Sequence, residues 1–99
     1  MNCDHNAIIV NLLTSMLGSI TPNWRAVFLR ITCTSVSVTF VLASDSPDDR
    51  AEISDVEFEF AALQPAYELM ITVAVDTSPI EKLANAGQLV FARKESYKT

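Results

Sequence analysis

The chain has 99 residues, of which 49% are hydrophobic and 19% charged, and its formal net charge is −5 at pH 7. This length accommodates one hydrophobic core, and the composition excludes a disordered chain. Phosphate backbones repel an acidic surface, so a basic protein is favoured over nucleic acid as a partner. No apolar run reaches the roughly 20 residues that span a bilayer. We therefore expect one domain over residues 1–99, without a membrane partner and with flexible tails at residues 1–5 and 96–99.

The N-terminus lacks the basic leader of a signal peptide, which predicts a cytoplasmic protein. Two cysteines, Cys3 and Cys33, are too few for a disulfide framework, and thiols stay reduced in the cytoplasm. Cys33 follows an apolar stretch and is expected to fill part of the core.

The first half of the chain predicts one helix and two strands. Apolar residues recur at steps of three and four over residues 6–18, which indicates a helix. Its expected buried stripe consists of Ile9, Leu12, Leu13, Met16 and Leu17, widened by Ile8 and Val10. Bulky and β-branched residues then favour a strand over residues 24–33, and the alternation over residues 35–42 is typical of a strand with one buried face.

A second helix is expected to begin at Ser46, because a serine cap, Pro47 at the first helical position and two acids in the first turn are start signals. Its apolar face would carry Ile53, Val56, Phe60 and Leu63. The alternation of Val56, Phe58 and Phe60 with glutamates also fits a strand. The cap and the longer helical repeat decide for a helix that ends at Gln64.

The second half continues with a strand over residues 67–75, a short helix over residues 79–86 closed by Gly87, and a last strand over residues 89–94. The order is helix, strand, strand, helix, strand, short helix, strand. This order predicts an α+β two-layer fold, in which a four-stranded, mainly antiparallel sheet carries two helices on one face.

The residues needed for catalysis or for metal binding do not come together in this sequence. His5 is the one histidine, and with Cys3 and Asp4 it lies on a terminus too loose to hold a zinc ion or a catalytic base. Two glycines do not suffice for a dinucleotide fingerprint or a phosphate loop. Exposed carboxylates stay ionised and make poor general acids. We expect neither enzymatic activity nor a cofactor or metal ion.

Negative charge gathers between residues 45 and 59, where seven of the twelve acids lie with one base, Arg50. One interpretation is a well-capped, solvated helix face. The other is an electrostatic docking surface for a basic partner, with Phe58 either as an aromatic anchor or tucked under a loop. The expected partner-binding residues are Asp45, Asp48, Asp49, Glu52, Asp55, Phe58 and Glu59.

Three segments together resemble small bacterial immunity proteins of contact-dependent growth inhibition and related polymorphic toxin systems. These are residues 18–27 (GSITPNWRAV), 48–65 (DDRAEISDVEFEFAALQP) and 89–95 (LVFARKE), and the resemblance extends over residues 7–95. It implies a non-catalytic, stoichiometric inhibitor of a basic toxin domain, often a nuclease. The alternative is a non-catalytic interaction module unrelated to toxins. Such a module would be a monomer or a weak homodimer that pairs through an edge strand such as Ser35–Thr39.

Overall fold

The computed structural model describes residues 5–94. Its elements are α1 (His5–Met16), β1 (Trp24–Ile31), β2 (Ser35–Leu42), α2 (Pro47–Leu63), β3 (Glu68–Val75), the 3-10 helix η1 (Ile80–Ala86) and β4 (Gln88–Ala92). The predicted order of elements is therefore confirmed. The predicted tails lie outside the described residues except for His5, which is the first residue of α1.

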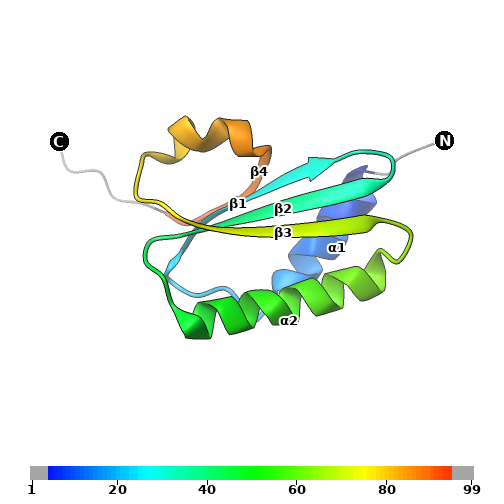
Figure 1. The fold of residues 1–99 in the computed structure, drawn as a ribbon, viewed down its shortest axis with the longest axis horizontal. Coiled ribbons are helices and arrows are strands. Elements are labelled where there is room, and N and C mark those ends of the chain that lie inside the picture. The colour runs from blue at the N-terminus through cyan, green and yellow to red at the C-terminus, as the bar shows by residue number, and fades with distance from the viewer. Residues whose placement is uncertain (1–4, 95–99) are drawn as a thin grey trace.

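The four strands form one sheet in the order β3-β2-β1-β4 (Figure 1). β1 pairs antiparallel with β2 and with β4, whereas β3 runs parallel to β2. α2 is the crossover between these parallel neighbours, as parallel pairing requires. The mainly antiparallel sheet is confirmed, but the expectation that Ser35–Thr39 forms an edge is wrong, because β2 is an interior strand.

The main core lies between the sheet and the two α-helices, which cover the same face of the sheet. Its helical contributions are Ile8, Leu12 and Met16 from α1 and Ile53, Val56 and Phe60 from α2. From the sheet, alternate residues of β1 and β2 point inward, and Trp24 packs edge-on against Phe40 with ring centroids 5.3 Å apart. η1 covers a smaller cluster around Phe28 on the opposite face.

Three expectations about burial are wrong. Val10, Leu13 and Leu17 of the expected α1 stripe face solvent, whereas Ile8, Leu12 and Met16 are buried as predicted. Leu63, expected on the apolar face of α2, is exposed in its last turn. Cys33 is exposed in the turn between β1 and β2, and it is disulfide-bonded rather than a reduced core thiol. Within residues 5–94, no helix is long and apolar enough to cross a membrane.

Candidate functional site

The start of α2 is built from the residues that the sequence predicted. Ser46 is the N-cap in an extended conformation, and its Oγ accepts a hydrogen bond of 3.3 Å from the backbone N–H of Asp49. Pro47 follows at the first helical position, and Asp48 lies in the first turn, where a carboxylate complements the positive end of the helix dipole. These local interactions set where the acidic helix begins.

Asp49 is held inside the protein and does not belong to the exposed acidic surface. The residue is 5% exposed. Its Oδ1 accepts a hydrogen bond of 2.7 Å from the hydroxyl of Thr21, and its Oδ2 accepts one of 2.7 Å from Nδ2 of Asn23. Both oxygens are thus engaged by the segment that leads into β1, which gives Asp49 a role in positioning α2.

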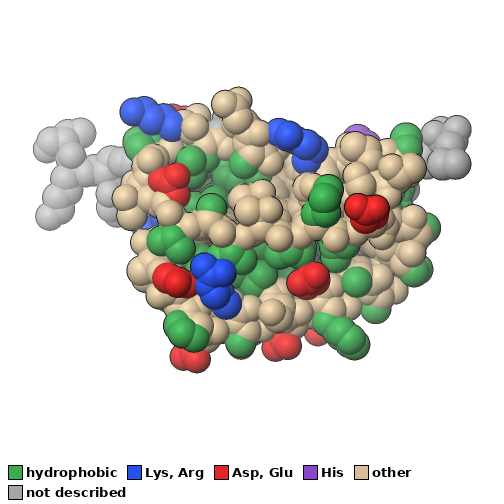
Figure 2. Space-filling model, viewed as in Figure 1, with side chains coloured by type: hydrophobic (Ala, Val, Ile, Leu, Met, Phe, Trp, Pro, Cys, Tyr) green, Lys and Arg blue, Asp and Glu red, His purple; other side chains and the backbone are tan. Residues whose placement is uncertain are grey.

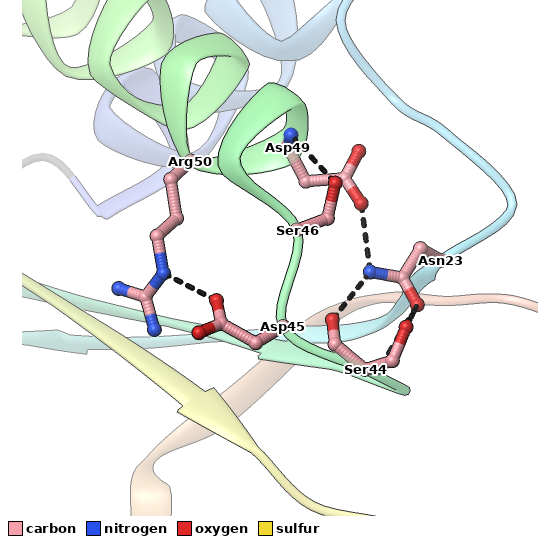
Figure 3. Close-up of polar contacts among 6 residues, drawn as sticks. All are labelled: Asn23, Ser44, Asp45, Ser46, Asp49 and Arg50. Carbon is pink, nitrogen blue, oxygen red and sulfur yellow. Dashed lines mark hydrogen bonds and ion pairs between the residues drawn. The ribbon is translucent and has the colours of Figure 1, made fainter.

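Asn23 extends this network to the connection between β2 and α2 (Figure 3). Its Nδ2 also donates to the carbonyl of Ser44 at 2.7 Å, and its Oδ1 accepts from the Ser44 backbone N–H at 3.0 Å. The Asn23 side chain therefore joins the segment before β1 to the β2–α2 connection and to the first turn of α2. The helix start is fixed by contacts within the protein.

Four acids share one flank of α2. They are separated by steps of four, three and four residues, so at about 100° per residue they lie one above another on the helix surface. We call this set the acidic stripe, and it consists of Asp48, Glu52, Asp55 and Glu59. Glu52 is half-buried and the other three are exposed. The structure therefore brings together four of the six acids expected to contact a partner.

Phe58 borders the acidic stripe and points into solvent, with 79% of the residue exposed. It lies about 200° around the helix from the buried Phe60, so α2 directs one aromatic ring into the core and the other away from it. The alternative that Phe58 tucks under a loop is excluded by this exposure. A large exposed aromatic ring is typical of an interface anchor.

The remaining acids of α2 and its cap lie away from the acidic stripe. Asp45 accepts a hydrogen bond of 2.6 Å from Nε of Arg50, which forms an ion pair with it. In Figure 3, this pair lies on the opposite side of the helix start from Asn23. Glu57 follows Arg50 by seven residues and shares its flank. Asp45 is therefore partly neutralised and separate from the other exposed acids.

α1 contributes a second exposed feature that the sequence did not predict. Val10, Leu13 and Leu17 are separated by three and four residues and are 58%, 38% and 75% exposed. We call them the aliphatic ridge. α1 and α2 pack against each other, so the ridge and the acidic stripe belong to the same helical layer. Figure 2 shows acidic and hydrophobic side chains side by side along the lower edge of the molecule, over α2.

The site contains the chemistry of a contact surface. Within residues 5–94, no group of three or more histidine, cysteine or acidic side chains is arranged to hold a metal ion. Carboxylates of the stripe offer charge and hydrogen-bond acceptors, and Phe58 and the aliphatic ridge offer area that water solvates poorly.

Comparison with known proteins identifies one family. The family model described as "MafI2 immunity protein" matches residues 5–95, which is nearly the whole chain. No curated protein sequence matches the chain.

Proposed function

Because this chain belongs to the MafI2 immunity protein family, we propose that it neutralises its cognate toxin by binding a basic toxin domain stoichiometrically through the outer face of its helical layer. The acidic stripe provides the charged part of that face. Phe58 and the aliphatic ridge provide its apolar part.

The acidic stripe is the observation that supports a basic partner. Like charges three and four residues apart on a helix repel one another by a few tenths of a kcal/mol per pair. A stripe of four carboxylates lowers the stability of the free protein, whereas a basic surface opposite it would convert the same charges into attraction. Complementary charge also accelerates the encounter of two proteins, which an inhibitor of a toxin requires.

The exposed apolar side chains support burial on binding. Charge complementarity contributes mainly to the association rate and to specificity, while a desolvated apolar centre holds a complex together. Phe58 borders the acidic stripe on α2, and α1, which carries the aliphatic ridge, packs against α2. A toxin surface with basic side chains beside an apolar patch would match this arrangement.

A nuclease is the toxin class that this surface fits best. A nuclease must bind phosphates, so the cleft that receives its substrate is basic. A rigid helix that presents carboxylates at regular intervals offers that cleft the same sign of charge as a nucleic acid backbone. We propose that the acidic stripe occupies or flanks this cleft.

The test is a matched pair of charge reversals on α2, measured as toxin-binding kinetics. Asp55→Lys changes the acidic stripe, and Glu57→Lys makes the same charge change on the opposite flank. We expect Asp55→Lys to slow association several-fold in low salt and less in high salt, because screening weakens exposed charges. Glu57→Lys should keep the wild-type association rate.

The triple variant Asp48→Lys, Asp55→Lys, Glu59→Lys should slow association by at least tenfold and should fail to protect cells that express the toxin. Equal effects of Asp55→Lys and Glu57→Lys would show that only net charge matters and that the stripe is not the docking face. A wild-type protein that forms no complex with the cognate toxin and gives no protection would refute the inhibitor proposal itself.

The cytoplasm is the location we propose for this activity. The Cys33 disulfide would be reduced there. Cys33 belongs to the turn between β1 and β2 and to neither helix, so toxin binding should be the same with and without a thiol reductant. A complex that forms only under oxidising conditions would argue for a different compartment.

A further inference from the structure

β3 is an apolar strand that the fold leaves unburied. Six of its eight residues are aliphatic or Met, yet none of them is buried. The neighbouring β2, by contrast, buries five of its eight. β3 occupies the edge of the sheet and pairs with β2 alone among the described strands. Between Leu69 and Val75 it carries no charged residue of the kind that protects edge strands from pairing.

The backbone groups on the outer edge of β3 can be identified from the bonds that it makes to β2. The N–H groups of Glu68 and Asp76 donate to carbonyls of the β2 side, at 2.9 and 3.1 Å. Residues of a strand direct their N–H and C=O groups to alternate sides. The groups of Leu69, Ile71 and Val73 therefore point outward, ready to pair with another strand.

We propose that β3 pairs antiparallel with β3 of a second copy of this chain, which joins two sheets into one across a two-fold axis at Ile71. In this register Ile71 pairs with its own counterpart and Leu69 pairs with Val73. These are the outward-facing residues, so each pair exchanges two backbone hydrogen bonds. Met70 then lies opposite Thr72 on the other face of the sheet. This dimer does not depend on the proposed function.

Charge selects this register over the next one. Shifting the axis to Thr72 would still pair outward-facing residues, but it would place Glu68 directly opposite Asp76 at both ends of the ladder. Like charges directly opposite each other destabilise a strand pair. With the axis at Ile71, Glu68 lies opposite Ala74, and every other pair within the strand is uncharged.

The charge distribution on α2 is compatible with the same dimer. A two-fold axis normal to the sheet keeps both helical layers on one face. In Figure 3, Arg50 extends from the side of α2 opposite Asn23. Asn23 precedes the interior strand β1, so this flank of α2 faces the β3 edge of the sheet. Glu57 shares the flank, so a base and an acid lie at this boundary. The acidic stripe lies on the other flank, where it stays separated from its counterpart and open to the toxin.

The strength of the dimer follows from its size. An eight-residue strand pair lies at the small end of specific interfaces, below about 1,200 Å² in total. We therefore expect a weak dimer with a dissociation constant between about 10 µM and 1 mM.

Two matched double variants test the dimer and its register by sedimentation or light scattering of the full chain. Met70 and Thr72 are exposed on the face opposite the α-helices, so both variants should fold. In the double variant Met70→Lys, Thr72→Lys, a lysine at position 70 of each copy lies opposite a lysine at position 72 of the other. These two like-charged pairs should raise the dissociation constant at least tenfold. Met70→Lys, Thr72→Glu places lysine opposite glutamate and should dimerise at least as well as wild type.

The controls separate charge and folding from pairing. The lysine–glutamate variant keeps the wild-type net charge of −5, and the double-lysine variant lowers its magnitude, so general repulsion cannot explain a loss of dimer. Circular dichroism and melting temperature check the fold of each variant.

A wild-type chain that stays monomeric to 1 mM overturns the proposal, as does a double-lysine variant that dimerises like wild type. Loss of toxin binding in that variant, with a monomeric wild type, would assign the edge to the toxin instead.

Discussion

Oδ2 of Asp49 accepts a hydrogen bond of 2.7 Å from Nδ2 of Asn23, 26 residues earlier in the chain. The contact joins the first turn of α2 to the residue that precedes β1. Because α2 carries the acidic stripe and Phe58, this part-buried pair sets where the proposed docking face lies relative to the sheet. The orientation of the face is thus set within the free protein, which lowers the cost of ordering it on binding.

Removing the Asp49 carboxylate should destabilise the protein. Asp49→Ala leaves the Thr21 hydroxyl and one N–H of the Asn23 amide without their acceptor in a part-buried site, and each unsatisfied polar group costs about 1–3 kcal/mol. We expect a loss of about 2–4 kcal/mol in the free energy of unfolding, measured by urea denaturation. Asp55→Ala, on the exposed flank, should change it by less than about 0.5 kcal/mol. Similar losses in the two variants would argue against a positioning role for Asp49.

The two phenylalanines of α2, Phe58 and Phe60, should separate binding from stability. Phe60 is 1% exposed in the core, so Phe60→Ala should cost about 3–5 kcal/mol of unfolding free energy. Phe58→Ala should leave stability within about 0.5 kcal/mol. It should weaken toxin binding about tenfold or more, mainly through faster dissociation. Wild-type affinity in Phe58→Ala would remove Phe58 from the docking face.

Gly87 lies where a side chain has no room. Its φ is +131°, and a Cβ built there would stand 2.7 Å from the carbonyl oxygen of Leu29. Gly87→Ala must therefore shift backbone between η1 and β4, and we expect a loss of about 2–4 kcal/mol. Gly18 has a φ of +84° with open space around it, so Gly18→Ala should cost only about 1–2 kcal/mol. Melting temperatures of the two variants give the comparison.

Asp76 makes a pH-dependent contribution at the end of β3. The Ser78 backbone N–H, which donates to Oδ1 at 2.7 Å, lowers the pKa of Asp76 below its ordinary value of 3.8, and the Ser78 hydroxyl and the Arg25 charge add to this. Because folding lowers this pKa, the ionised carboxylate stabilises the folded protein at pH values above the unfolded-state pKa. This stabilisation is lost as the pH falls through the folded-state pKa. The stability difference between wild type and Asp76→Asn should therefore be full at pH 5–7 and should shrink below about pH 3.8. A difference that stays constant down to pH 2 would contradict this.

The local signals in the sequence predicted the elements well. The Ser46 cap, Pro47 and the acids of the first turn act within a few residues, so they could be interpreted without the fold. The same signals decided correctly between helix and strand for residues 56–60, where the alternation alone was ambiguous. The fold class followed from the order of elements, because each strand needs one face covered and each helix has one face to bury.

Features that depend on contacts between residues far apart in the chain could not be predicted from local sequence patterns. α1 is apolar around most of its circumference, so its periodicity did not select the buried stripe, and the exposure of Leu13 and Leu17 was missed. In the sequence, nothing distinguishes Asp49 from its acidic neighbours, because its partner Asn23 lies 26 residues earlier and is brought to it only by the fold. The parallel pairing of β2 and β3, which puts β3 at an edge, also depends on how α2 crosses the sheet.

The inward and outward faces of α2, called its two halves below, have different roles, and this affects how the sequences of such proteins can diverge. The inward half closes the core and connects two adjacent strands, so its residues are constrained by folding. The outward half is exposed and can change charge, size or shape while the scaffold stays intact. With the proposed docking face on this outward half, single substitutions on one helix can change which toxin is recognised while the fold is retained.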